Sequence, residues 1–326
     1  MPDSPFAIGL LVRIAIATIG TIATPSQIVS QVVSAPPMLT ALPGREEDAR
    51  VAAVAFRVAI AGRVRCPVTE PVLGLMLQHL SQFETSDRPR LVTDQALDRG
   101  PSVTVVVPAG PASIAGLIPG DVLLAIDGRA LPPEGALSAR FDARIAHARA
   151  DAIDDLLAAN SVPFIATRLR GGIVSAVRVI PLPACHSRVY LARSGQRNAY
   201  ADGRHVFLTT GLLARIRNDH ELAFVIAHEM AHNILRHATI IRGGMVRRGL
   251  KQRLGRSGQI VRETEREADA LGGELMLDAG FDPVEGAYIL RRLGKGSLGI
   301  TLFAAHDSAS SRITAMRMLA EARRTP

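Results

Sequence analysis

The chain has 326 residues, of which 48% are hydrophobic and 21% are charged, a balance that excludes a disordered or collagen-like protein. Its two cysteines exclude a disulfide-dense scaffold, and an aromatic content of 4% without tryptophan excludes a stacking platform for single-stranded nucleic acid. The formal net charge is +8, but nearly all the basic residues are arginines, a skew typical of a GC-rich genome, so we expect no nucleic-acid partner. The length is about twice that of one domain, which predicts two domains.

The first segment, residues 1–35, predicts a signal peptide or an N-terminal membrane anchor. Phe6–Ala23 is apolar except for Arg13, and Val33–Ala35 offers a cleavage site of the small-x-small type. An uncleaved anchor is the alternative, and it requires an arginine near the middle of the span. We expect export to the periplasm or the cell envelope, with the proline-rich residues 36–44 as a linker.

An amphipathic helix is predicted next, within residues 45–65, from the apolar spacing of Val51, Val54 and Val58. A β-rich section follows over residues 66–184. Its predicted elements are strands at 103–107, 122–126 and 173–180, a hairpin turn at Asp127-Gly128 and a short helix at 152–159.

Four short motifs stand in this β-rich section: Pro111-Ala112, Ala115-Gly116-Leu117, Pro119-Gly120-Asp121 and Ile126-Asp127-Gly128. Together they resemble a PDZ domain of the bacterial type. The resemblance implies that Leu73, Gly74 and Leu75 form a carboxylate-binding loop. Backbone N–H groups there would capture a C-terminus while the ligand chain adds to the sheet as an extra strand.

The two cysteines bracket the same section. In an exported protein, Cys66 and Cys185 are expected to form one disulfide across the neck where the section leaves and rejoins the chain. The alternative is two unrelated buried thiols.

A later, largely apolar helix carries the candidate metal ligands. Asn218 is its expected N-cap, with Glu221 completing a capping box. Within the helix, His228 and His232 are four residues apart, so both imidazoles lie on one face and can reach a single zinc ion. Glu229 lies beside that face, where it can act as the base for the water. The alternative is a buried helix whose histidines only satisfy hydrogen bonds, but this leaves buried polar groups uncompensated.

A third ligand must come from elsewhere. On a continuous helix, His237 lies about 140° around from the second histidine, so it is not expected to reach the same ion. Glu265 and Asp269 are four residues apart in another predicted helix, where the glutamate can complete a His₂Glu site and the aspartate can orient a histidine. A solvated acidic helix start is the alternative, and it is our expectation for Glu263 and Glu267.

Four motifs follow one another along the C-terminal half: Asn198-Ala199-Tyr200-Ala201 with Thr210–Leu213, His228–His232, Glu265–Asp269, and His306 followed by Arg312. In this order they resemble the gluzincin metallopeptidase family that holds the CAAX prenyl proteases, the HtpX heat-shock proteases and the BepA-like periplasmic proteases. Asp307 replaces the proline that usually follows the histidine of the last motif. The resemblance covers residues 45–62 and about 185–323, which makes the PDZ-like section an insertion.

This resemblance implies a zinc endopeptidase with one Zn²⁺ per chain. It also implies an extended substrate paired along an edge strand at Asn198, Ala199 and Tyr200. His306 and Arg312 would stabilise the oxyanion or hold the substrate backbone as catalytic residues. The alternative for that pair is a helix-start histidine and a surface arginine.

The stretch from residue 242 to residue 262 is basic and interrupted by glycines. A lid over the cleft, a membrane-surface contact and a solvated loop all remain open for it.

The sequence as a whole predicts an α+β protein. A mainly helical gluzincin peptidase domain with a small β-sheet is expected in residues 45–65 and 185–326, and an inserted β-rich PDZ-like domain in residues 66–184. The expected function is an exported zinc metalloendopeptidase that cleaves protein or peptide substrates in envelope protein quality control. The PDZ-like domain is expected to recognise those substrates, in part through their C-termini. The alternative is a non-catalytic PDZ adaptor on a degenerate peptidase scaffold, and the intact Glu229 argues against it.

Overall fold

The computed structural model describes residues 45–132, 140–241, 243, 255–293 and 307–324. These all fall in one of the two units into which the chain divides, Ala41–Pro326. The predicted signal peptide and linker, His306 and most of the basic stretch lie outside the described residues. Within the described part, no helix has both the length and the apolar character needed to cross a membrane.

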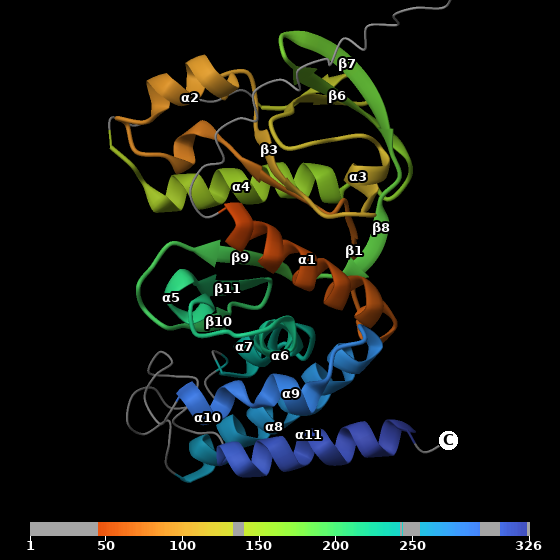
Figure 1. The fold of residues 1–326 in the computed structure, drawn as a ribbon, viewed down its shortest axis with the longest axis vertical. Helices are drawn as coiled ribbons and strands as arrows, with labels where there is room; N and C mark the ends of the chain where they lie inside the picture. Colours follow the sequence, from red (N-terminus) through yellow and green to blue (C-terminus); the bar gives the residue numbers. More distant parts are fainter. Residues whose placement is uncertain (1–44, 133–139, 242, 244–254, 294–306, 325–326) are drawn as a thin grey trace, which may run out of the picture. The chain divides into compact units, whose positions relative to one another are not determined.

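Helix α6 (Asp219–Ile234) belongs to the larger hydrophobic core and packs against three other helices (Figure 1). Its neighbours are α1 (Arg45–Ala61), α8 (Gly255–Asp278) and α9 (Pro283–Ala287), and α11 (Ala309–Arg324) packs in turn on α8 and α9. Every residue of α6 from Glu221 to Asn233 is buried. A helix with neighbours on all sides buries apolar residues on all sides, which accounts for the continuous apolar run from Leu222 to Ala227.

The N-cap predicted for α6 is present. The Asn218 side chain accepts a hydrogen bond from the backbone N–H of Glu221 at 2.9 Å. The predicted capping box is wrong in its second half, because Glu221 Oε2 accepts from the backbone N–H of Arg217 at 2.8 Å. This buried carboxylate also pairs with Arg292 of α10 (Ile289–Leu293), and so ties the start of α6 to a second helix.

A three-stranded sheet lies beside these helices, in the order β10-β11-β9. Strand β9 (Arg188–Ala192) runs parallel to β11 (His205–Thr209), and β10 (Ala199–Ala201) pairs antiparallel with β11. The short helix α5 (Thr210–Leu213) follows β11 directly. Among the described residues no further strand pairs with β10, which leaves it as an edge.

The second core belongs to an antiparallel sheet in the order β2-β3-β4-β6-β7, with β5 paired to β4. Its strands are β2 (Leu75–Gln78), β3 (Ser102–Val106), β4 (Val122–Ile126), β5 (Arg129–Ala130), β6 (Phe164–Arg170) and β7 (Ile173–Val179). Its helices are α2 (Arg88–Gln95), α3 (Pro111–Ile114) and α4 (Ala143–Ala158). The α+β class predicted from the sequence is confirmed.

Several features of this region differ from expectation. Helix α4 begins at Ala143, nine residues before the predicted start at 152, with Asp142 as its N-cap accepting from the N–H of Arg144 at 2.8 Å. Strands β2 and β6 and helix α2 were not predicted. The predicted turn at Asp127-Gly128 is present, and both residues have positive φ, 46° and 75°.

The predicted disulfide is present. Cys66 and Cys185 are bonded, with Cα atoms 5.4 Å apart and a separation of 119 positions in the chain. Next to the bond, β1 (Thr69–Val72) pairs with β8 (Leu182–Cys185), so the entry and exit of the β-rich section are joined both covalently and by a strand pair.

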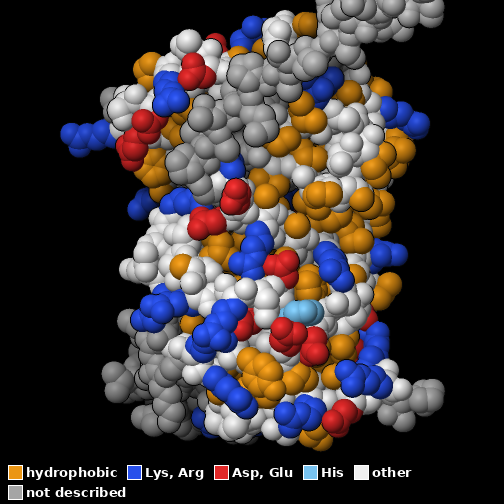
Figure 2. Space-filling view, viewed as in Figure 1, with side chains coloured by type: hydrophobic (Ala, Val, Ile, Leu, Met, Phe, Trp, Pro, Cys, Tyr) orange, Lys and Arg blue, Asp and Glu red, His pale blue; other side chains and the backbone are white. Residues whose placement is uncertain are grey.

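Basic side chains do not form one continuous patch on the face shown in Figure 2. They are spread over it and alternate with acidic ones. The positive net charge is therefore distributed on this face, and many of the arginines are paired with carboxylates.

Candidate metal centre and peptide groove

The predicted metal ligands come together where α6 packs on α8. His228 Nε2 lies 3.2 Å from His232 Nε2 and 3.2 Å from Glu265 Oε2, and His232 Nε2 lies 3.4 Å from Glu265 Oε2. A tetrahedral zinc ion with bonds of about 2.0–2.1 Å holds neighbouring ligand atoms about 3.3 Å apart. The three atoms thus have the spacing of three corners of such a tetrahedron.

The first histidine is oriented from behind by a carboxylate. His228 Nδ1 lies 3.0 Å from Asp269 Oδ1, which leaves Nε2 to face the metal position. Asp269 is held in turn by Arg312 of α11. A partner of this kind fixes the tautomer and ring orientation of a ligating histidine.

The second histidine has a comparable support that the sequence did not predict. Helix α6 ends at Ile234, and Arg236 adopts the left-handed conformation with φ 56°, after which α7 (His237–Ile240) begins. This reversal places His237 Nδ1 2.9 Å from His232 Nδ1, and His237 Nε2 3.1 Å from Glu267 Oε2. The assumption of a continuous helix beyond His232 was wrong, and Glu267 has a specific partner although its side chain is 54% exposed.

Glu229 lies beside the three ligands and is almost completely buried, with 1% of its surface exposed. Its Oε1 atom has no hydrogen-bond partner among the described residues. Burial raises its pKa, against the opposing charges of His228 and His232. A buried carboxylate oxygen without a partner, next to a His₂Glu set, fits a site that holds a zinc ion and a water molecule.

Opposite charges dominate the electrostatics of this centre. Burial by itself lowers the pKa of His228, but hydrogen bonds and charge from Asp269 and Glu265 raise it to about 10. Burial raises the pKa of both carboxyls, but their contacts with the histidines and with Arg312 outweigh it and hold both pKa values below the ordinary range. The buried carboxylates of Glu265 and Asp269 lie among the histidine rings of this centre, and their negative charge favours a bound cation.

The predicted substrate strand packs against α6, the helix that carries His228 and His232. Asn198 continues the pairing of β10, since its carbonyl accepts from the N–H of Thr209 at 3.0 Å. Ala199 is buried, whereas Tyr200 is 43% exposed and stacks on Phe207 with ring centroids 4.9 Å apart.

Asn233 of α6 holds the turn between β10 and β11. Its Oδ1 accepts from the N–H of Gly203 at 2.7 Å, and its Nδ2 donates to the carbonyl of His205 at 3.0 Å. This residue, which sequence reasoning missed, ties the edge strand to the helix that carries the ligands.

The late motif is only partly described. His306 lies outside the described residues, and the next residue, Asp307, pairs with Arg266 at 2.8 Å. Arg312 is 4% exposed, with its guanidinium on Asp269 and 5.6 Å above the ring centroid of Phe224. The structure therefore places Arg312 on Asp269, which contacts the predicted metal ligand His228, and the alternative of a surface arginine is wrong.

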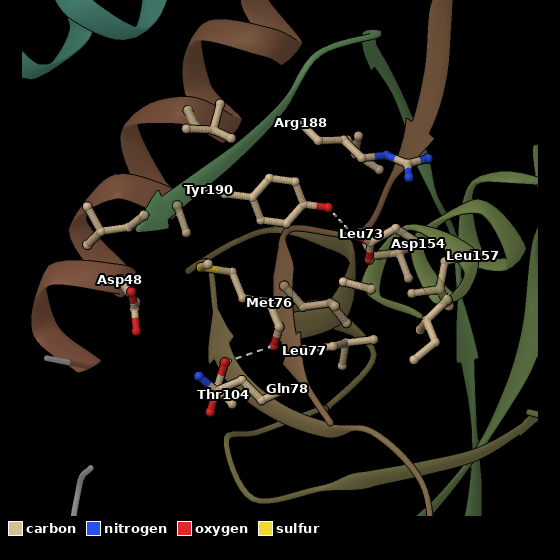
Figure 3. A pocket seen from close by; sticks show the side chains of 18 of the residues that line it. Asp48, Leu73, Met76, Leu77, Gln78, Thr104, Asp154, Leu157, Arg188 and Tyr190 are labelled. Carbon is tan, nitrogen blue, oxygen red and sulfur yellow. Dashed lines mark hydrogen bonds between the residues drawn. The ribbon is translucent and has the colours of Figure 1, made fainter. Parts of the chain in front are cut away.

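A cavity of about 530 Å³ opens between β2 and α4 and is also lined by α1 and β9 (Figure 3). The predicted loop Leu73, Gly74 and Leu75 forms part of its wall. Gly74 has φ +67°, and a side chain there would meet the ring of Phe56 in α1 at 3.0 Å. Among the described residues β2 pairs only with β3, so its free edge borders the cavity.

One polar pair crosses this cavity wall. The Tyr190 hydroxyl of β9 donates to Asp154 Oδ2 of α4 at 2.8 Å, as drawn in Figure 3. Burial raises the pKa of Asp154, partly offset by this hydrogen bond. The contact connects the helix of the β-rich section to the small sheet.

Comparison with known proteins gives two family matches. Residues 166–250 match the model of Peptidase family M48, and residues 102–137 match that of a PDZ domain. The first match includes both ligating histidines but ends before Glu265, so the third ligand rests on the geometry alone. A search of curated proteins found no match.

Among solved structures, the HtrA-type protease AlgW with decapeptide is 24% identical, over 36% of this chain and 30% of that one, with a TM-score of 0.24. The HtrA3 PDZ domain bound to a phage-derived ligand is 16% identical, over 36% of this chain and 89% of that one, with a TM-score of 0.26. This chain therefore spans less than a third of the length of the first of these proteins.

The family matches confirm the two resemblances found in the sequence and support a metallopeptidase. Residues 166–250 are thus similar to peptidase family M48, and residues 102–137 to a PDZ domain.

Proposed function

We propose that the protein is an exported zinc-dependent endopeptidase that hydrolyses peptide bonds of protein substrates in envelope quality control, with its PDZ domain aiding substrate recognition. The single observation that carries the proposal is the His228, His232 and Glu265 triangle, with edges of 3.2–3.4 Å, beside the buried and unpartnered Glu229. Each of these groups has a role in peptide hydrolysis, and a binding scaffold needs none of them.

Zinc, when bound by these three residues, polarises the scissile carbonyl and lowers the pKa of water. Glu229 takes the proton of the attacking water and passes it to the leaving amine, a task suited to a carboxyl whose pKa is raised by burial. Asp269 and His237 hold the two histidines with their Nε2 atoms forward. Arg312 acts through Asp269 and is therefore a positioning residue. We propose for His306 the role that the family resemblance implies, which is to stabilise the oxyanion or to hold the substrate backbone.

Substrate recognition is proposed at two strand edges. The edge of β10 at residues 198–200 offers backbone groups for pairing with an extended chain, and β10 packs against the helix that carries the two histidines. The edge of β2 offers the same beside the cavity, where the loop of residues 73–75 would receive a C-terminal carboxylate.

Export rests on the predicted signal or anchor and is supported by the disulfide, since such bonds persist in oxidising compartments. We also propose that the basic stretch of residues 242–262 contacts a membrane surface. Cell fractionation would test export and membrane contact together. Recovery of the chain in the cytosol with free thiols would contradict export.

The catalytic proposal is tested by zinc content and by cleavage of unfolded casein, measured on the same samples of residues 36–326. The Glu229→Gln variant should keep its zinc and lose cleavage by roughly 10²–10⁴-fold. The Glu265→Ala variant should lose cleavage together with the zinc ion held by His228, His232 and Glu265. Glu263→Gln, an exposed position on the same helix, is the matched control and should change neither. A folded wild-type chain that binds no zinc would favour the PDZ adaptor, and full cleavage by Glu229→Gln would refute the assigned base.

The groove is tested separately with a peptide that has a free C-terminus and its amidated form. Ala150 lines the cavity, whereas Ala148 on the same helix is exposed and does not. Ala150→Trp should fill the groove and abolish binding of the free-carboxyl peptide, whereas Ala148→Trp should leave it intact. Equal binding of the two peptide forms would contradict the carboxylate-binding loop.

A further inference from the structure

A second group of metal-ligand side chains lies between α4 and β11, and it shares no residue with the centre described above. It consists of His147 and Asp151 of α4 and His205 of β11, whose ligand atoms all lie within 4.8 Å of one another. His147 and Asp151 are four residues apart, so both side chains lie on the same face of α4. His205 faces them from the neighbouring strand.

His205 is held in one orientation by Asp202. Its Nδ1 lies 2.9 Å from Asp202 Oδ2, while Asp202 Oδ1 accepts from the backbone N–H groups of His205 and Arg204 at 2.7 and 2.8 Å. An imidazole that donates from Nδ1 to a carboxylate carries its lone pair on Nε2. This is the arrangement of a metal-ligating histidine with its orienting carboxylate.

The lone pair on His205 Nε2 lies next to another acceptor. Nε2 is buried, makes no hydrogen bond to any described residue, and lies 3.2 Å from Asp151 Oδ1. The side chain as a whole is 5% exposed. A nitrogen lone pair and a carboxylate oxygen at this distance repel each other unless a proton or a metal ion lies between them.

His147 supplies a third donor on the open side. Its Nε2 lies 3.7 Å from Asp151 Oδ2, and its ring meets that of His205 edge to face with centroids 5.2 Å apart. The side chain of His147 is 40% exposed, which leaves room for water as a further ligand. Tyr190 and Phe207 pack their rings against His147 and limit its rotation.

Two arginines on the same sheet side, Arg188 and Arg204, are already paired with carboxylates. Arg188 is paired with Glu70 at 3.0 Å and with Asp155 at 2.9 Å, and Arg204 is also paired with Asp155. Their charge is thus balanced by carboxylates outside the group.

We propose that His147, Asp151 and His205 bind a second divalent transition-metal ion of the zinc class, with water completing the shell. Two imidazoles and one carboxylate form the donor set that Zn²⁺ takes in open protein sites. The ion joins α4, which forms one wall of the peptide groove, to β11, which pairs with the edge strand β10. It thereby fixes the groove helix to the sheet beside the peptidase centre.

The test counts zinc bound to the full-length chain after stripping with a chelator and equilibrium dialysis against Zn²⁺. The wild type should bind two ions per chain, and His147→Gln and Asp151→Asn should each bind one. His147 is half-exposed, so its variant should fold. His220→Gln, at a half-exposed histidine outside both groups, is the control and should still bind two.

The Glu265→Gln variant isolates the second site from the peptidase centre. It should keep one ion, and adding His147→Gln should remove it, whether or not the protein cleaves peptides. The proposal is overturned if the wild type binds a single ion that Glu265→Gln abolishes, as expected if His205 is instead a protonated ring between two carboxylates. It is equally overturned if the second ion persists in both His147→Gln and Asp151→Asn.

Discussion

Arg312 binds both carboxylate oxygens of Asp269, with Nε 2.6 Å from Oδ2 and Nη2 2.5 Å from Oδ1. Asp269 Oδ1 is also the partner of His228, a predicted metal ligand. Three helices, α6, α8 and α11, thus meet in one chain of charged and polar contacts beside the proposed metal site. The sequence resemblance had assigned Arg312 to the oxyanion or the substrate, and its burial on Asp269 replaces that role with one of positioning.

Arg312→Ala should therefore destabilise the protein even without metal. The substitution leaves the Asp269 carboxylate buried without its cationic partner, and breaking a buried pair in this way costs about 3–5 kcal/mol. Urea unfolding of the zinc-free protein measures the loss, and the double variant with Asp269→Asn should be less destabilised than the sum of the single variants. If Arg312 served only the substrate, stability and zinc affinity would not change.

His237→Phe should weaken zinc binding by about 10–100-fold, because it removes the nitrogen that fixes the His232 ring. Competition with a chromophoric chelator gives the affinity. Glu267→Gln should have a smaller effect, since that carboxylate is half-exposed and acts only through His237. Unchanged affinity in His237→Phe would show that the contact has no bearing on the metal.

Reduction of the disulfide should lower the free energy of unfolding by up to about 4–5 kcal/mol, because the bond closes a long loop in the unfolded chain. The chain has no other cysteines, so reduction changes this bond alone. Unfolding of oxidised and reduced samples should be compared, with the double variant Cys66→Ser, Cys185→Ser as a check that is insensitive to reductant. Coincident curves would contradict a stabilising bond.

Acid should destabilise the β-rich section through His79. Burial, with the charge of Arg149, lowers the pKa of this histidine from 6.5 to about 4. The unfolded chain then binds more protons between those values, so stability is complete above pH 6.5 and falls as the pH drops toward 4. The full pKa difference between the unfolded and the folded state corresponds to a decrease of about 3 kcal/mol in the free energy of unfolding.

His79→Gln should flatten this part of the stability–pH curve relative to the wild type. Urea unfolding at several pH values between 4 and 7.5 measures the difference between the two proteins. His220→Gln, at a half-exposed position, should retain the wild-type slope. Parallel curves for the wild type and His79→Gln would show that His79 titrates alike in both states.

The sequence by itself determined the features that depend on residues close together in the chain. Four-residue spacing on a helix fixes which side chains share a face, and this alone aligned His228 with His232 and Glu265 with Asp269. The turn at Asp127-Gly128 was equally local, because only a few residue types accept positive φ at both positions. The family resemblance then ordered these pieces into a peptidase with a PDZ domain.

Only the tertiary structure decided which distant groups meet. The reversal at Arg236 that brings His237 behind His232 depends on one residue in a left-handed conformation, for which arginine gives no signal. The sequence did not predict the early start of α4. The first turns of this helix contact His205 and Tyr190 through His147, so they lack the regular spacing of apolar residues that indicates a buried helix. Contacts such as Arg312 with Asp269 or His147 with His205 depend on how the helices and strands pack against one another. The spacing of residues along the chain does not determine that packing.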